Sequence, residues 1–263
     1  MKVVIIGSGN VATALGRTIL TAGHVIVQVA GRNRETVVRL AEEWGAHPTT
    51  GWGTVDKTAD IYLVALSDSA LPGLGKALSL PSKLVLHTSG ALPADTLRDV
   101  TDRAGVLYPL QSFGRGIAPP EEFPLLIDAV RPEDIPLIRG FAGTLATQVV
   151  RADDAVRLKL HVAAVLVNNF TNHLYTLAAD FCRQENIDFH LLLPLIRETA
   201  RRVGSTDPRD VQTGPAIRGD GITLEKHRQS LSNYHNIKQL YDLFTILIEE
   251  YYRSLDGRGR PLE

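Results

Sequence analysis

The sequence predicts an α/β fold in which a doubly wound, mostly parallel sheet is followed by an all-α C-terminal domain. Two observations carry this prediction. Strand and helix patterns alternate up to about residue 150, and from Arg151 onward apolar residues recur only at helical spacing. The 263 residues are also enough for two domains with separate cores. We therefore expect domains at 1–151 and 152–263.

The expected strands of the first domain are short runs of aliphatic residues bounded by turn residues. In chain order they span 2–6, 24–30, 60–66, 83–88, 105–107, 124–129 and 147–150. In the second domain, helical stretches are expected at 153–185, 189–203, 223–232 and 236–254. Asp188 is placed to begin the second stretch, and Pro194 is expected to kink it. The tail at 256–263 is expected to fray.

The first strand leads directly into Gly7-Ser8-Gly9-Asn10-Val11-Ala12 and then into an apolar helix. In this pattern Gly7 permits a tight turn, Gly9 lets a pyrophosphate approach the backbone, and Ala12 lets helix and strand pack closely. The free N–H groups of the helix N-terminus attract the phosphates. Similar turns elsewhere serve packing only, but the next strand arrives at the spacing of a βαβ unit. We expect a Rossmann domain that binds a dinucleotide through residues 7–12.

The end of the second strand indicates which dinucleotide is bound. A carboxylate there would bind the ribose diol of NAD, whereas this chain has Ala30-Gly31-Arg32-Asn33-Arg34. Each guanidinium can bind a phosphate through its planar fork. We therefore expect NADP(H), with Arg32, Asn33 and Arg34 at the 2′-phosphate. The alternative is that both arginines are solvated residues that open the next helix.

Further polar groups follow the carboxyl ends of later strands, where ligands bind in open α/β sheets. In 65–69, Leu66, Ser67 and Asp68 either line the cofactor site or cap the next helix. In 87–90, Ser89 is expected to bind substrate, and His87 is either a proton donor or a buried, hydrogen-bonded residue. The segment 108–113 either fixes a small substrate or shapes a surface turn.

The first helical stretch of the second domain carries a mostly polar stripe. His161, Val165, Asn168, Asn172 and Tyr175 are spaced to lie on one helix face, whereas Lys159 points to nearly the opposite side. Buried amides need partners, so the stripe is expected to meet a polar cleft, a ligand or a second subunit. A satisfied core network is the alternative. His161 is thus a second candidate proton donor, with Asn168 and Asn172 placed to position substrate.

Composition excludes several classes of function. The formal net charge is −1 and the basic residues are dispersed, so no cluster of positive charge is expected that would bind nucleic acid or anionic lipid. The single cysteine, Cys182, precludes an intrachain disulfide and a cysteine-based zinc site, which fits a reducing, cytoplasmic location. No apolar run approaches about 20 residues, so no membrane span is expected, and no metal-ligand spacing is found.

The motifs at 7–12 and 31–34 and the helical second domain resemble the two-domain dehydrogenases related to pyrroline-5-carboxylate reductase, 6-phosphogluconate dehydrogenase and β-hydroxyacid dehydrogenases. Within that superfamily the chain is most similar to a subgroup of uncharacterised Rossmann-like oxidoreductases. The segments that carry this similarity are 87–90, 108–113, 159–161, 168–173 and 213–220. The resemblance implies an NADP-binding domain, a helical domain that dimerises and an active site between them. The lysine–asparagine pair of β-hydroxyacid dehydrogenases is absent, because Ala163 lies four residues after Lys159.

The sequence therefore predicts an NADP(H)-dependent oxidoreductase that transfers a hydride to or from a small substrate in the interdomain cleft. The expected substrate is a keto or hydroxy acid, or an imine or amine, and a carboxylate on it would fit this prediction. A homodimer is expected through the helical domain, without nucleic acid or membrane partners. The alternative is a non-catalytic NADP(H)-binding regulator or sensor, because Rossmann-like domains also serve in that role.

Overall fold

The computed structural model describes residues 1–114, 116–117, 120 and 122–255. The chain folds into two compact units, the first spanning Met1–Asn169 and the second beginning at Phe170. The predicted boundary at 151/152 coincides with the end of the last strand, so it marks a change of secondary structure. The division into domains at that point stays a prediction. The expected fraying of 256–263 lies outside the described residues.

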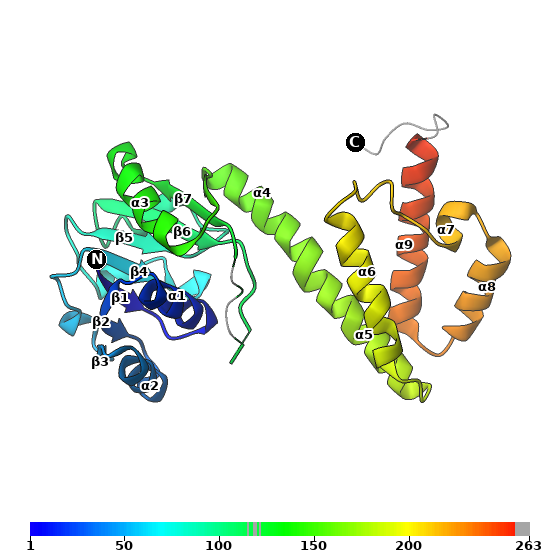
Figure 1. Cartoon of the computed structure of the whole chain (residues 1–263), viewed down its shortest axis with the longest axis horizontal. Helices are drawn as coiled ribbons and strands as arrows, with labels where there is room; N and C mark the ends of the chain where they lie inside the picture. Colours follow the sequence, from blue (N-terminus) through cyan, green and yellow to red (C-terminus); the bar gives the residue numbers. More distant parts are fainter. Residues whose placement is uncertain (115, 118–119, 121, 256–263) are drawn as a thin grey trace. The chain divides into compact units, whose positions relative to one another are not determined.

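The first unit contains an eight-stranded sheet in the order β3-β2-β1-β4-β5-β6-β7-β8 (Figure 1). All neighbouring strands pair in parallel except β6 and β7. The doubly wound, mostly parallel sheet is thus confirmed. The strands are β1 (Lys2–Ile6), β2 (Val25–Ala30), β3 (His47–Thr49), β4 (Ile61–Val64), β5 (Leu84–His87), β6 (Arg103–Pro109), β7 (Leu125–Ala129) and β8 (Val149–Arg151).

Alternating side chains of the central strands enter two separate cores, one on each face of the sheet. Val3 and Ile5 of β1 pack with residues of helices α1 (Asn10–Thr21), α2 (Arg34–Trp44) and α3 (Ile135–Leu145). Val4 and Ile6 pack on the other face with residues from loops and short 3₁₀ turns. This two-sided burial explains the continuous apolar runs of the strands, which are typical of parallel sheets.

Helix α4 (Asp154–Ala164) ends in a π-helical segment, Val165–Phe170, which crosses the division between the units. The second unit contains α5 (Thr171–Gln184), α6 (Leu193–Val203), α7 (Pro215–Arg218), α8 (Gly221–Ser230) and α9 (His235–Arg253). The all-helical C-terminal region is thus confirmed. None of the helices among the described residues is long and apolar enough to cross a membrane.

Two local expectations in the second unit are settled by hydrogen bonding and position. The Asp188 side chain accepts a hydrogen bond from the His190 N–H and so begins the turn Phe189–Leu192, as expected. The expected kink at Pro194 is wrong. Pro194 lies in the first turn of α6, where its missing N–H would have no helical partner in any case.

Candidate functional site

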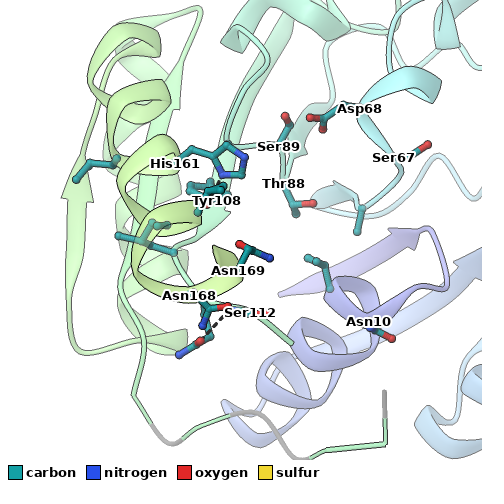
Figure 2. Close-up of a pocket in the computed structure, with 18 of the residues that line it drawn as sticks. Asn10, Ser67, Asp68, Thr88, Ser89, Tyr108, Ser112, His161, Asn168 and Asn169 are labelled. Atoms are coloured by element: carbon teal, nitrogen blue, oxygen red, sulfur yellow. Dashed lines mark hydrogen bonds between the residues drawn. The ribbon is translucent and has the colours of Figure 1, made fainter. Parts of the chain in front are cut away.

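A pocket of about 750 Å³ lies in the first unit, beyond the carboxyl ends of β1, β4, β5 and β6. The order of the sheet reverses between β1 and β4, and open α/β sheets bind ligands at such a switch point. One wall is formed by α4 and the π-helical segment (Figure 2). The lining residues are Gly9–Val11, Ala65–Asp68, Thr88–Gly90, Tyr108, Leu110–Ser112, Leu160, His161, Ala163–Val165 and Val167–Asn169.

The turn between β1 and α1 has the features that a phosphate group requires. Gly7 has φ +129°, and a Cβ there would lie 2.2 Å from the Ala65 carbonyl oxygen, so only glycine fits. At Gly9 a Cβ would meet nothing within 4 Å, because the residue faces the pocket. Gly9 is the N-cap of α1 and no side chain caps this helix end. The first N–H groups of α1 therefore remain available to an anion.

The other fingerprint residues support this turn. Asn10 and Val11 line the pocket beside Gly9. Ala12 is fully buried in the core, as expected for the small residue between helix and strand. Ser8 does not line the pocket, and its Oγ lies 3.4 Å from the place that a Cβ on Gly31 would occupy. The backbone after β1 thus lies close to the end of β2.

Arg32, Asn33 and Arg34 follow β2 directly. Asn33 caps α2, because its side chain accepts a hydrogen bond of 3.0 Å from the Thr36 N–H. Arg34 is the first residue of α2 and lines another pocket of about 290 Å³, together with Pro48, Thr49 and Thr50. Both arginines are exposed. Neither forms a hydrogen bond or ion pair with the described part of the chain, so both guanidiniums are available to an external anion.

His87 is fully buried at the end of β5 and does not line the pocket. Its Nε2 lies 3.0 Å from the Pro93 carbonyl oxygen, and its Nδ1 accepts a hydrogen bond from the Ser89 N–H. Burial lowers the pKa of His87 to about 4, and the charge of Arg157 acts in the same direction. A neutral, buried ring with both nitrogens hydrogen-bonded to backbone cannot reach a substrate in the pocket, so the alternative of a buried structural residue is the better interpretation.

Ser89, two residues later, does line the pocket. Its Oγ accepts hydrogen bonds from the N–H groups of Ala91 (3.2 Å) and Leu92 (3.0 Å). These two bonds occupy the lone pairs of the oxygen, which leaves only the hydroxyl proton to interact with a ligand. Ser89 is therefore placed as a hydrogen-bond donor to the pocket.

His161 and Tyr108 form a polar pair in the pocket wall. The Tyr108 hydroxyl oxygen lies 2.9 Å from His161 Nδ1, and the two rings meet edge to face at a centroid distance of 5.8 Å. Burial raises the pKa of Tyr108, and the nearby Asp68 carboxylate adds to this effect. The hydroxyl therefore keeps its proton, and it either donates to Nδ1 or accepts from an Nδ1–H group, according to the protonation of the His161 ring. Both residues were predicted individually from the sequence, but their contact was not, because no spacing rule links positions 53 apart.

The polar stripe predicted from the sequence is only partly preserved. His161, Val165 and Asn168 line the pocket, and so does Asn169, which was not predicted. Figure 2 shows Asn169 and Thr88 directed toward the same space. A π turn bonds residue i to i+5 and so inserts an extra residue, which changes the face that each later residue occupies. Asn172 and Tyr175 belong to the second unit and are not among the lining residues.

The segment after β4 also reaches the pocket. Leu66, Ser67 and Asp68 all line it, and their binding of a cofactor stays a prediction. Ser67 precedes the short turn Asp68–Ala70 but makes no capping hydrogen bond to it, and its Oγ lies 3.3 Å from Ser69 Oγ. Lys159 is exposed and lies outside the pocket. Within the described residues, no group of three or more potential metal ligands occurs.

Two family models match the chain. A Rossmann-like domain matches residues 1–111, and a domain of unknown function, DUF2520, matches residues 123–248. No curated protein matches the sequence significantly. The described fold agrees with the first model, since 1–111 contains β1 to β6 and the α1 turn.

Several solved structures are similar over nearly the whole chain. A protein of Bacteroides fragilis named “putative NADP oxidoreductase” is 37% identical, with a TM-score of 0.85 over 95% of this chain and 98% of that one. An imine reductase of Myxococcus stipitatus, solved with NADP⁺, is 18% identical with a TM-score of 0.66 over 99% and 96% of the two chains. The 1-pyrroline-5-carboxylate reductase of Streptococcus pyogenes is 13% identical with a TM-score of 0.63 over 95% and 98%. At these lower identities the likeness concerns the fold alone.

Proposed function

The chain belongs to the family of its Bacteroides fragilis relative, within the two-domain NADP-dependent dehydrogenase superfamily, and we propose that it is an NADP(H)-dependent oxidoreductase. The observation that carries this proposal is one pocket whose wall includes both the uncapped N-terminus of α1 and the polar pair of Tyr108 and His161. The name of that relative supports the cofactor, as do the NADP⁺ complex of the imine reductase and its fold.

The cofactor would be bound at its two phosphate-bearing parts by the β1–α1 turn and by the end of β2. Residues 7–12 would bind the pyrophosphate, because Gly9 leaves open space and the first N–H groups of α1 lack partners. Arg32 and Arg34 would bind the 2′-phosphate, since both guanidiniums are exposed and unpaired within the described residues. Bound NADP(H) supplies or accepts the hydride.

The chain's own contribution to the reaction would be a proton from His161. In its protonated form the ring would donate from Nδ1–H to the Tyr108 hydroxyl oxygen and carry a second proton on Nε2. Nε2 has no hydrogen-bond partner among the described residues. When hydride reaches a carbonyl or imine carbon, His161 would donate this proton to the oxygen or nitrogen. In the reverse direction, it would accept the same proton.

The substrate would be a small carbonyl or imine compound held by hydroxyl and amide groups. Ser89, Asn168 and Asn169 line the pocket and offer hydrogen bonds, and Asn172 remains a predicted contributor. Among the described lining residues there is no lysine or arginine, so a substrate carboxylate would be bound by neutral donors. Asp68 is the one carboxylate among them, and it would favour an amine or iminium group nearby.

The experiment that tests the proposal compares NADPH and NADH binding by calorimetry in wild type, Arg32→Ala and Arg34→Ala. We expect wild type to bind NADPH more tightly than NADH. Each substitution should weaken the binding of NADPH by roughly tenfold or more, because hydrogen bonds to the charged 2′-phosphate are lost, and should leave the affinity for NADH unchanged. Arg39→Ala is the matched control, since Arg39 is an exposed residue of α2 that forms an ion pair with Glu43 at 3.7 Å.

A folded protein that binds neither nucleotide would refute the proposal. If NADPH binds, its oxidation is followed with a panel of α-keto acids, aldehydes and cyclic imines. Turnover that His161→Asn reduces at least about 100-fold would support an enzyme with this proton donor. Tight NADPH binding without turnover across the panel would instead favour the non-catalytic sensor.

A further inference from the structure

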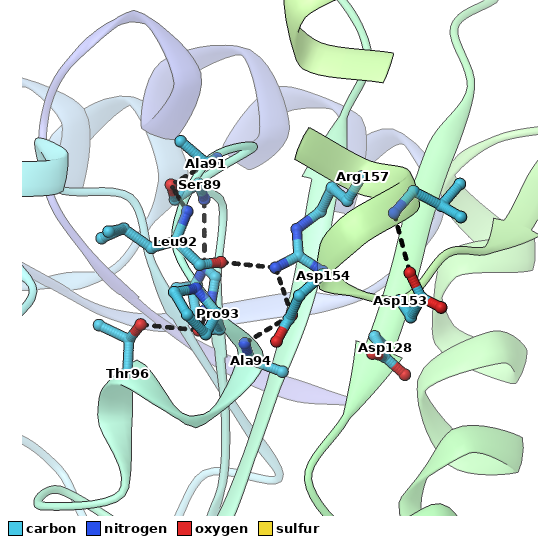
Figure 3. Close-up of polar contacts among 12 residues, drawn as sticks. Ser89, Ala91, Leu92, Pro93, Ala94, Thr96, Asp128, Asp153, Asp154 and Arg157 are labelled. Carbon is cyan, nitrogen blue, oxygen red and sulfur yellow. Dashed lines mark hydrogen bonds and ion pairs between the residues drawn. The ribbon is translucent and has the colours of Figure 1, made fainter. Parts of the chain in front are cut away.

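Arg157 is a buried charge on α4 that the proposed reaction does not use. Its side chain is 1% exposed, and its Nη2 donates hydrogen bonds to the Leu92 carbonyl oxygen (2.5 Å) and to Asp154 Oδ1 (2.7 Å) (Figure 3). The same carboxylate oxygen accepts a hydrogen bond of 2.9 Å from the Ala94 N–H. Arg157 and Asp154 thus bind the loop after β5 at two points, Leu92 and Ala94. We call these two residues the α4 clamp.

The clamped loop is the one that carries Ser89 and Gly90 into the pocket. Leu92 connects the two, since its carbonyl oxygen accepts from Arg157 while its N–H donates to Ser89 Oγ. The buried His87 ring holds the same loop from the sheet side, through the Ser89 N–H and the Pro93 carbonyl oxygen. A continuous series of hydrogen bonds therefore runs from α4 to the Ser89 hydroxyl.

The same helix face presents His161 to this loop. Arg157 and His161 are four residues apart on α4 and so occupy one face. Gly90 packs directly on the polar pair, because a Cβ there would lie 2.7 Å from His161 Nδ1 and 2.8 Å from the Tyr108 ring. The His161 contact at Gly90 and the clamp at Leu92 and Ala94 thus fix to α4 the part of the loop that directly follows Ser89.

Stability alone does not account for the buried guanidinium. Arg157 Nε and Nη1 are buried and have no hydrogen-bond partner, and unpaired buried polar atoms cost free energy. An apolar side chain of similar volume often replaces a buried charge without loss of stability. Asp154 is half exposed, so losing Arg157 would not leave a buried, uncompensated carboxylate.

We propose that Arg157, together with Asp154, is a positioning residue that holds the Ser89 hydroxyl donor at a fixed separation from the His161–Tyr108 pair. The role of these groups in catalysis rests on the proposed oxidoreductase function. The structural role of the clamp, which is to hold the loop, does not depend on that function. Without the clamp, the loop would move relative to α4, and the donor and the proton source would no longer be aligned on one substrate. Misplacement of this kind can cost about 100-fold in rate.

The test uses the full-length protein with Arg157→Met, Arg157→Lys and Asp154→Asn. Hydrogen exchange followed by mass spectrometry reports on the amides of Ala91, Leu92 and Ala94. We expect exchange in this segment to rise roughly tenfold or more in Arg157→Met, with the rest of the first unit unchanged. Lysine keeps one donor group and should recover part of the protection. Arg151→Met is the matched control, because Arg151 is exposed and lies 3.7 Å from its partner Asp128.

NADPH is the probe for the functional part of the test. The affinity for NADPH is expected to stay within about twofold of wild type, since the phosphates bind elsewhere, while the fluorescence change of the nicotinamide on binding is reduced. With a substrate from the panel, kcat should fall by about 100-fold in Arg157→Met, with partial rescue by lysine.

Unchanged amide hydrogen exchange at residues 88–97 in Arg157→Met would show that the clamp does not hold the loop. Faster exchange with unchanged nicotinamide fluorescence and kcat would also overturn the proposal, since the residue would then serve only the fold. If wild type fails to bind NADPH, the proposed function falls, but the exchange measurement still decides whether the clamp exists.

Discussion

His87 and His161 are the same residue type in opposite settings, and their surroundings decide what each can do. The His87 ring is inaccessible and both of its nitrogens are bonded to backbone, so it braces the loop after β5. The His161 ring lines a pocket and has one nitrogen fixed by Tyr108. A proton donor needs access to substrate as well as a suitable ring, and only His161 has that access.

The buried His87 makes the stability of the first unit depend on pH. Burial lowers its pKa to about 4 from the usual 6.5, so between these values the unfolded chain binds a proton that the folded chain does not. Stability should therefore be complete above about pH 6.5 and decline as the pH falls toward 4, by up to about 3 kcal/mol. The measurement is urea unfolding between pH 4.5 and 7.5, followed by tryptophan fluorescence.

Both tryptophans, Trp44 and Trp52, lie in the first unit, so the signal reports on the domain that contains His87. His87→Gln should remove most of this pH slope, whereas His47→Gln, a change at an exposed residue of β3, should keep it. An identical slope in wild type and His87→Gln would show that other groups cause the dependence.

The sequence could identify most site residues individually but not their partners. Gly7, Gly9 and Ala12 were recognisable because they form a local pattern of small residues directly after the first strand. The burial of His87, by contrast, depends on neighbours from Pro93 and α4, and the Tyr108–His161 contact joins residues far apart in the chain. Arg157 had no distinguishing signal, since an arginine at helical spacing is ordinarily solvated.

At the scale of elements, the two glycines of the β1–α1 turn differ in whether the backbone requires them. Gly7 is required by the backbone, because of its positive φ and the adjacent Ala65 carbonyl. Gly9 has an ordinary φ of −82° as N-cap of α1, and a Cβ there would contact nothing. The described structure therefore does not require glycine at position 9, which agrees with the proposed approach of a phosphate at this residue.

This difference predicts opposite results for two similar substitutions. Gly7→Ala should destabilise the first unit strongly, since the Cβ would overlap backbone. Gly9→Ala should leave the melting temperature nearly unchanged but weaken NADPH binding by roughly tenfold or more, because the methyl group occupies the phosphate approach. Thermal unfolding and NADPH titration of both variants test this. Normal NADPH affinity in a stable Gly9→Ala protein would show that the phosphate does not bind at this turn.

Among the elements that escaped sequence prediction, two were missed for clear physical reasons. Strand β3, His47-Pro48-Thr49, is a three-residue edge strand without an apolar run, so its pairing with β2 leaves no pattern in the sequence. The π-helical segment Val165–Phe170 has an apolar pattern that fits a regular helix equally well. Its extra residue brings both Asn168 and Asn169 to the pocket wall, and π turns occur frequently at functional sites.

At the scale of the whole molecule, the two units differ in how they bury apolar surface. The first unit has two extensive cores, one on each face of its sheet. In the second unit, the buried residues among those described are Cys182, Leu224, Leu231 and Thr245. A largely apolar pocket of about 420 Å³ lies among its helices, and large apolar side chains are exposed along α9. Surfaces of this kind mark protein interfaces.

We therefore expect a homodimer in which the second unit is covered by a second copy of the chain, because oligomers of identical chains usually pair the same surface twofold. Leu243 and Leu247 are 51% and 41% exposed and lie four residues apart on α9. Leu243→Glu with Leu247→Glu should convert the dimer to monomer in sedimentation experiments, since charges are excluded from an apolar interface. Asn236→Glu with Gln239→Glu adds the same charge at exposed polar positions of α9 and should leave the dimer intact. A wild-type protein that sediments as a monomer at all concentrations would contradict this interpretation, and the exposed leucines would then need another partner.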